Sequence, residues 1–260
     1  SVVRGVNGTT AAGHVDGATV ALKNGGAVTI SDSLISNNIS DALGGGVYNQ
    51  DLLEVHRTEI VGNTANSRGG GVYNVSVTDA TNGAVTITAT TITLTDASAF
   101  PDDTPFDVSV GSEVMQVTSV NGNELTVVRG SGGTTAAPHS DASLVVLQGF
   151  SSVVVSESTF ANNVAVSAGG GIFNEDALSV VNSTISSNQA GAGGGVASVG
   201  SGSLTAVTVV TNSAGNAGGL AADGGSITMK NTLVAANFAS GTDVDVRGVF
   251  ISEGNNLVGD

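Results

Sequence analysis

The chain of 260 residues has no cysteine, which excludes disulfide bonds, thiolate metal sites and cysteine nucleophiles. Its 22 acidic residues outnumber 7 Lys and Arg, and the net charge of −15 argues against a nucleic-acid-binding protein, which needs clustered basic side chains. Aromatic residues make up only 3%. No apolar run reaches the roughly 18 residues of a membrane span, so we expect a core of Val, Ile, Leu and Ala and no membrane insertion.

The start of the chain repeats a later stretch at a constant offset of 125 positions. Residues 2–5, with the sequence Val-Val-Arg-Gly, align with residues 127–130, and His14 aligns with His139. We therefore interpret residues 1–25 as the end of a partial β cassette and the chain as a tandem duplication. This pattern favours a fragment of a longer repeat protein, or an N-terminal piece that is completed from outside the chain.

A short repeat, called a rung below, fills residues 26–74 and 150–260. The motif Gly-Gly-Gly-Val-Tyr-Asn occupies 44–49 and 69–74 and returns as Gly-Gly-Gly-Ile-Phe-Asn at 169–174. One asparagine marks the same position in each of six rungs: Asn38, Asn63, Asn163, Asn188, Asn212 and Asn237. Successive members of this set are separated by 25, 100, 25, 24 and 25 positions, so the value of 100 equals one rung plus an insertion.

Apolar residues keep fixed distances from these asparagines. Three positions before them lie Ile35, Ile60, Phe160, Ile185, Val209 and Val234. Eight positions before them lie Ile30, Val55, Val155, Val180, Leu204 and Met229, and ten before lie Val28, Leu53, Val153, Leu178, Gly202 and Ile227. Apolar positions two apart indicate a strand, whereas a helix would space them three and four apart.

A unit this short cannot bury a face alone, so the rungs must stack on one another. Short strands separated by Gly and Asn corners predict an all-β parallel β-helix, and the crossover rule, together with the family resemblance described below, implies that it is right-handed. The asparagine column is expected to form an internal ladder of side-chain amide hydrogen bonds. The glycine triplets suit corners that need positive φ or a close backbone approach.

Residues 75–149 break the rung pattern and are called the cassette below. Residues 84–95 alternate apolar residues with threonine, which predicts a half-buried strand. Residues 110–120 and 124–128 also alternate, and Asn121-Gly122 between them predicts a hairpin. We interpret the cassette as a small all-β domain inserted into the β-helix, which continues in residues 150–260.

Two stretches resemble bacterial surface proteins. Residues 160–163 (Phe-Ala-Asn-Asn) and 169–172 (Gly-Gly-Gly-Ile) resemble the FxxN and GGA[ILV] repeats of polymorphic outer-membrane proteins. Residues 231–260 resemble the last rungs of right-handed β-helix surface proteins with a choice-of-anchor C-terminus. The resemblance covers roughly two thirds of the chain. It implies export, a location at the cell surface or outside the cell, and often adhesion, and it brings no catalytic residues.

The sequence therefore favours a structural or adhesive repeat segment rather than an enzyme. We expect partners to be other copies, packed head to tail into a fibre, neighbouring repeats of the same protein, or a glycan or host surface. The alternative is a carbohydrate-binding or carbohydrate-cleaving β-helix. Cleavage of a glycosidic bond needs two carboxylates about 5–9.5 Å apart, for which Asp51 and Asp176 are candidates at equivalent rung positions. Tyr48, Tyr73 and Phe173 could form an aromatic stripe, although a packing role is favoured.

One candidate metal site lies in the cassette. Asp102, Asp103 and Asp107 cluster in a predicted loop, and carboxylate oxygens are the ligands that Ca²⁺ prefers. Solvated acidic residues are the alternative. No other cofactor is expected.

Overall fold

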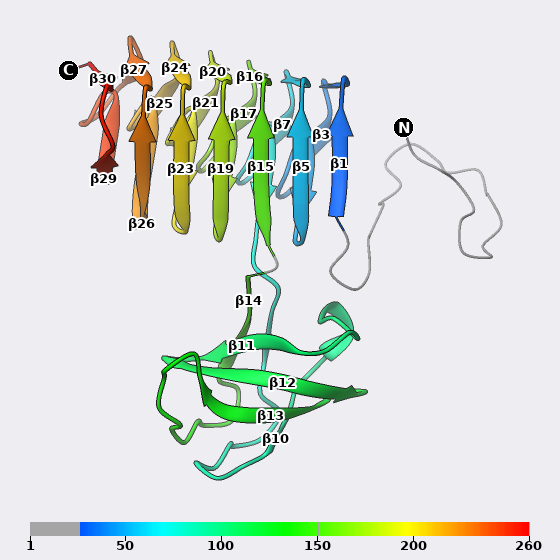
Figure 1. The fold of residues 1–260 in the computed structure, drawn as a ribbon. Helices are drawn as coiled ribbons and strands as arrows, with labels where there is room; N and C mark the ends of the chain where they lie inside the picture. Colours follow the sequence, from blue (N-terminus) through cyan, green and yellow to red (C-terminus); the bar gives the residue numbers. More distant parts are fainter. Residues whose placement is uncertain (1–26, 150, 260) are drawn as a thin grey trace, which may run out of the picture.

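The computed structural model describes residues 27–149 and 151–259, so the predicted partial cassette at 1–25 lies outside the described residues. The rungs stack into a rod, and the cassette projects from one side of it (Figure 1). In Figure 1 the chain rises along the front of the rod, crosses the top and descends behind, while it advances from blue to red. That path is right-handed, and all strand pairs between rungs are parallel, so the predicted parallel β-helix is confirmed.

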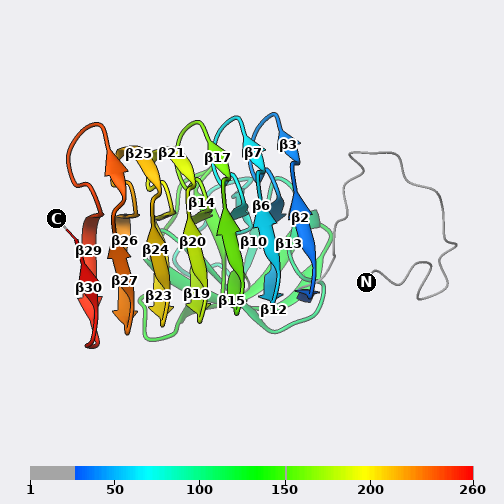
Figure 2. The same ribbon diagram turned by 90° about the horizontal axis from the view of Figure 1, so that it is seen from above.

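Each rung contributes strands to four positions around the rod. The first position holds β1 (Ala27–Ser31), β5 (Leu52–His56), β15 (Ser152–Ser156), β19 (Ala177–Val181), β23 (Ser201–Thr205), β26 (Leu220–Lys230) and β29 (Val246–Ser252). The second holds β2 (Leu34–Ser36), β6 (Glu59–Val61), β16 (Thr159–Ala161), β20 (Thr184–Ser186), β24 (Thr208–Val210), β27 (Leu233–Ala235) and β30 (Leu257–Val258). The third holds β3 (Ile39–Ser40), β7 (Thr64–Ala65), β17 (Val164–Ala165), β21 (Gln189–Ala192), β25 (Ser213–Asn216) and β28 (Phe238–Ala239). The fourth holds β4 (Val47–Asn49), β8 (Val72–Asn74), β18 (Ile172–Asn174), β22 (Val196–Ser198) and the start of β26. Figure 2 shows the second position from above, with its strands side by side.

The predicted apolar columns fill the interior of the rod. Val153 on β15 pairs with Leu53 on β5 and with Leu178 on β19, although the whole cassette lies between the first two in the sequence. Phe160 lies between Ile60 and Ile185 in the next column and is fully buried. The insertion of the cassette therefore leaves the stacking of rung on rung unbroken.

The glycine triplets meet two separate steric requirements at one corner, a positive φ at the first glycine and a close approach of rungs at the second. Gly169, the first of its triplet, has a φ of +66°, which side chains with a Cβ adopt with strain. Gly170, the second, lies directly under the next rung, where a Cβ would collide with the carbonyl oxygen of Gly194. The triplets thus allow both the corner and the close approach of rungs that the sequence predicted.

The asparagine column forms a continuous ladder inside the rod. Asn163 donates from both its backbone N–H and its Nδ2 to Oδ1 of Asn188, each at 2.9 Å. Asn188 makes the same pair of bonds to Asn212, again at 2.9 Å. The second Nδ2 hydrogen of Asn163 bonds to the carbonyl of Ile60, so the buried amide has its donors and acceptor satisfied.

The ladder has a direction and an end. Its first described member, Asn38, is exposed and donates to Asn63, and the same pattern runs on to Asn237. Asn237 donates to Oδ1 of Asp245 from Nδ2 at 2.7 Å and from its backbone at 3.0 Å. Because an ionised carboxylate accepts but does not donate, the column stops at Asp245.

The cassette has its own sheet and its own core. Its elements are β9 (Thr78–Ala80), β10 (Thr91–Thr93), the 3-10 helix η1 (Ala97–Ala99), β11 (Phe106–Val110), β12 (Glu113–Asn121), β13 (Glu124–Ser131) and β14 (Leu144–Gln148). They form an antiparallel sheet in the order β10-β13-β12-β11-β14-β9, around a core that includes Met115. The hairpin at Asn121-Gly122 is present between β12 and β13.

The threonine-rich run at 84–95 is only partly a strand, in contrast to the prediction. β10 takes Thr91–Thr93, with Ile92 buried, but the residues before it turn, and the N–H of Ala89 donates to the carbonyl of Thr86. The guanidinium of Arg129 also bonds to the Thr86 carbonyl at 2.6 Å. These contacts take up backbone groups that a continuous strand would use for pairing.

We expect Asn188→Ala to lower the free energy of unfolding of the rod by about 2–4 kcal/mol, because Asn163 loses the acceptor for two buried donors. Gln189→Ala, a change at the exposed neighbour, is the control. The two methionines report on the two units separately, since Met229 lies in the core of the rod and Met115 in that of the cassette. Methyl NMR during urea unfolding should shift only the Met229 transition; equal stability of the two variants would contradict the ladder's role.

Candidate functional site

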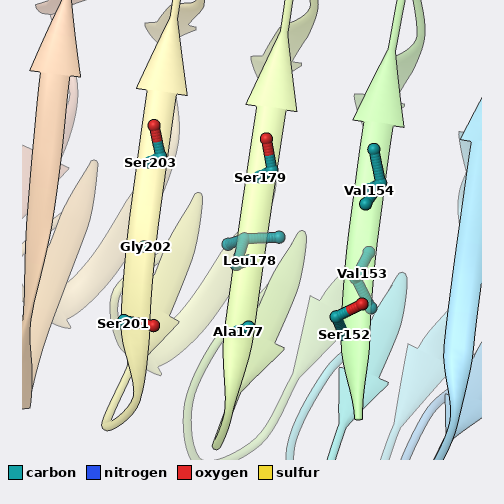
Figure 3. Close-up of a pocket in the computed structure, with 9 residues that line it drawn as sticks. All are labelled: Ser152, Val153, Val154, Ala177, Leu178, Ser179, Ser201, Gly202 and Ser203. Carbon is teal, nitrogen blue, oxygen red and sulfur yellow. The ribbon is translucent and has the colours of Figure 1, made fainter. Parts of the chain in front are cut away.

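A shallow groove crosses the outer face of β15, β19 and β23 near their first residues. Its volume is about 330 Å³, and its outward-facing lining consists of Ser152, Val154, Ala177, Ser179, Ser201 and Ser203. Figure 3 shows these residues on three adjacent strands. We call this surface the serine groove. It lies beside the point where the cassette leaves the rod, since β15 begins directly after the cassette (Figure 1).

The serine groove exists because outward positions carry small residues on three successive rungs. In the strand pairing, Leu52 stands next to Ser152 and Glu54 stands next to Val154, so larger side chains on β5 border the groove. None of the four serine hydroxyls hydrogen-bonds to another described residue, and all four are therefore available to a ligand. The signal for this groove in the sequence is the run of mostly small residues 11 and 9 positions before the ladder asparagines, which differs from the acidic and aromatic positions considered above.

Asp51 and Asp176 flank the base of the cassette on stacked corners of the rod. Ser76, on the corner between them, donates from Oγ to Oδ2 of Asp176 at 3.4 Å. Burial raises the pKa of both carboxyls, and the Ser76 hydrogen bond partly opposes this for Asp176. Because the two residues are two rung steps apart, their backbones lie about 10 Å apart. The limit of about 9.5 Å for an inverting glycosidase applies to the carboxyl groups themselves, and cleavage by this pair stays an untested alternative to the expected non-enzymatic role.

The three aromatic residues stack in register instead of forming an open stripe. The ring centroids of Tyr48 and Tyr73 are 5.5 Å apart, and those of Tyr73 and Phe173 are 5.4 Å apart. Tyr73 and Phe173 are each only 4% exposed, whereas Tyr48 is 48% exposed. Tyr73 donates to Glu175 at 2.6 Å, and the Arg68 guanidinium lies 4.9 Å above the Phe173 ring. Burial, together with Glu175, raises the pKa of Tyr73. The stack therefore has the packing role that the sequence favoured.

A second buried polar column lies within the Gly-Gly-Gly-x-x-Asn motif and was not predicted from the sequence. Asn49 donates to Asn74 at 2.7 Å, Asn74 donates to Asn174 at 2.8 Å, and Asn174 donates to Ser198 at 2.9 Å. These residues are the last members of the Gly-Gly-Gly-x-x-Asn copies and the equivalent serine. This column holds the corner from which the cassette and the groove strands begin.

Asp102, Asp103 and Asp107 are not gathered into a metal centre. Asp102 and Asp103 are exposed, and Asp107 lies on β11, where one of its carboxyl oxygens is buried without a hydrogen bond. Across residues 27–149 and 151–259, no group of three or more His, Asp or Glu is arranged to hold a metal ion. Binding of Ca²⁺ stays a prediction that the geometry does not support. The same residues contain no helix long and apolar enough to span a membrane.

The cassette contains a buried carboxylate with an unusually complete set of donors. Arg129 donates to the two Glu113 oxygens at 2.7 and 2.8 Å, and the backbone N–H groups of Gly130 and Ala137 each donate at 3.0 Å. His139 Nε2 lies 2.7 Å from the same carboxylate. One short segment, 129–139, thus supplies every hydrogen-bond partner that the Glu113 carboxylate has among the described residues. The recurrence of its Arg and His at the start of the chain was the signal for this cluster.

These donors control the ionisation of Glu113. Burial alone would raise the pKa of the carboxyl, but the hydrogen bonds from Arg129, Ala137, His139 and Gly130 outweigh burial and lower the pKa from 4.5 to about 2. The cluster holds the loop between β13 and β14 against β12. None of its residues lines the serine groove.

Comparison with known proteins gives one family match. A model of the Chlamydia polymorphic membrane protein repeat matches residues 157–175, which include the motifs at 160–163 and 169–172. The sequence-based resemblance to such repeats is thereby supported for this stretch, and the choice-of-anchor resemblance stays a prediction. A search of curated protein sequences finds no match to the chain.

Solved structures with a similar fold include phage tailspikes. The tailspike protein gp49 from Pseudomonas phage LKA1 has a TM-score of 0.35 and 13% identity, covering 84% of this chain and 46% of its own. Gp61 from Pseudomonas phage phi297 has a TM-score of 0.27 and 15% identity, covering 78% and 43%. Gp54 of Acinetobacter baumannii bacteriophage AP22, solved with a capsular saccharide, has a TM-score of 0.21 and 9% identity, covering 80% and 53%. The chain spans about half the length of these structures, and the likeness concerns the fold.

We expect Glu113→Ala to destabilise the cassette by about 3–5 kcal/mol, because Arg129 would be left buried without its partner. Glu124→Ala, at the exposed start of β13, is the matched control. Urea unfolding followed at the Met115 methyl group measures the effect, and the Met229 transition should not move. A Met115 transition that is the same in both variants would contradict this role.

The same cluster should make the cassette acid-sensitive. Because the pKa of Glu113 in the folded cassette is about 2 and its ordinary value is 4.5, its contribution is complete above pH 4.5 and is lost as pH falls toward 2. That contribution amounts to about 3 kcal/mol. Glu113→Gln should make the stability of the cassette, again measured at Met115, depend less on pH between 4.5 and 2. Glu124→Gln should leave this pH dependence unchanged.

Proposed function

We propose that this chain is a rigid structural and adhesive segment of an exported protein at the cell surface or outside the cell. The match of residues 157–175 to a polymorphic membrane protein repeat supports a surface-protein repeat. The rigidity of the segment is supported by the register of its strands. The pairings β1-β5, β5-β15, β15-β19 and β19-β23 each run without a register shift. A stack locked in this way holds outward side chains in straight rows, which suits the display of a binding surface.

Self-association is a further part of the proposal, and the ladder constrains its form. Asp245 accepts from Asn237 and has no side-chain N–H to donate to a following rung. A head-to-tail contact at that end must therefore form through other groups than the asparagine column. Electron microscopy with and without a calcium chelator would reveal filaments and would test the Ca²⁺ prediction in the same experiment.

The second candidate function is carbohydrate binding, and the serine groove favours it. Its accessible lining is mainly apolar, with four serine hydroxyls among the small side chains, and this mixture suits sugar rings, which present both hydroxyl and C–H surfaces. Binding and display are compatible, because an adhesive segment needs a face that contacts its target. Cleavage of a carbohydrate would require a further catalytic arrangement and is not part of this proposal.

Beads coated with the purified chain are expected to attach to cell surfaces several-fold more than albumin-coated beads, because the rows of outward side chains offer many identical contacts. Attachment is counted under flow before and after enzymatic removal of surface glycans. The control uses beads coated with the Asn188→Ala chain and heated above the temperature at which that chain unfolds. It shows whether attachment needs the folded surface. Attachment no greater than that of albumin beads would overturn the adhesive function.

A further inference from the structure

The serine groove cannot recognise a peptide by adding a strand. β15 is paired on one side with β5 and on the other with β19, and β19 is paired in turn with β23. The backbone N–H and C=O groups beneath the groove are therefore already used in the sheet. Strand addition needs a free sheet edge, so a ligand of this groove has to be recognised by side chains.

The side chains form a regular grid. Neighbouring strands are about 4.8 Å apart, and alternate residues on one strand are about 7 Å apart. One row reads Ser152, Ala177 and Ser201, and the next reads Val154, Ser179 and Ser203. Each row combines apolar and hydroxyl groups, and none of these hydroxyls is engaged within the described protein. The volume of about 330 Å³ is at the small end of the range for ligand sites.

Three acidic residues lie close to the groove without lining it, and two of them accept a hydrogen bond, Glu54 from Thr29 and Asp176 from Ser76. Asp176 directly precedes Ala177, Asp51 directly precedes Leu52 beside Ser152, and Glu54 stands next to Val154. None of these three carboxylates takes part in an ion pair among the described residues. The arginines of the described part instead pair with other acids: Arg57 with Asp32, Arg68 with Glu175, Arg129 with Glu113, and Arg247 with Asp223.

The groove is thus complementary to a cationic ligand, in a chain whose net charge is −15. We propose that the serine groove binds a glycan containing amino sugars with free, protonated amines. The inference rests on the proposed glycan-binding function and names its site and its ligand class. Sugar rings lie over Val154 and Ala177, the serine hydroxyls bond to the sugar hydroxyls, and an ammonium group lies toward Asp176 or Asp51.

The test uses the full chain and three tetrasaccharides: a glucosamine tetramer with free amines, its fully N-acetylated form, and an oligogalacturonate. Isothermal titration calorimetry is expected to show at least tenfold tighter binding of the free amine than of the acetylated form, and none of the acidic sugar. Ser179→Ile fills the groove and should abolish binding. Thr228→Ile is the matched control, since Thr228 occupies the same row on β26 beyond the groove and its change should have no effect.

Asp176→Asn tests the charge separately and should remove most of the preference for the free amine, while Glu59→Gln, at an exposed position of β6, should not. Saccharide binding that survives Ser179→Ile would overturn the groove as the site and leave glycan binding intact. Equal affinity for the free and acetylated tetramers would overturn the ligand class. Binding of a lysine-rich peptide in place of all three sugars would overturn the inference, and bead attachment would still decide the adhesive function independently.

Discussion

The hydrogen bonds of the buried asparagine column fix how each rung is placed on the next. Each amide in its middle accepts two bonds from the rung before and donates to the rung after, so a shift of one rung by a single residue would leave several buried groups unpaired. The aliphatic columns favour stacking but tolerate small displacements, because hydrophobic contact has no direction. The hydrogen bonds of the amides are directional, and they therefore fix the register of each rung on the next.

The outer surface follows from that register. Since Ser152, Ala177 and Ser201 must lie side by side, small residues at one repeat position become a continuous depression on the face of the rod. The same rule turns Tyr48, Tyr73 and Phe173 into a stack in which two of the three rings are covered. Identical chemistry at one repeat position therefore yields either a surface feature or a packed column, depending on what covers that face.

The cassette is organised by a different principle. Its strands are antiparallel and do not repeat, so no column can hold them, and a single carboxylate fixes the long loop between β13 and β14. The donors to Glu113 come from one segment, 129–139, which folds around the charge. A buried charge is tolerated here because both carboxylate oxygens are hydrogen-bonded and the Arg129 guanidinium, which donates to both of them, compensates the charge.

The repeat period was enough to predict the rung, its strands, the asparagine ladder and the apolar columns. A fixed period makes like residues stack on one another, and it reveals which positions must remain apolar or carry an amide. It also located the cassette and its Asn121-Gly122 hairpin, since local turn chemistry decides such a hairpin. The pairing of β5 with β15 across the inserted cassette also followed from the spacing of 100 positions, whereas the tertiary structure was needed to show that Glu113 meets Arg129 and that three serine-bearing strands form a groove. Those contacts depend on which segments become neighbours and on what remains uncovered, and neither is encoded in a local pattern or a period.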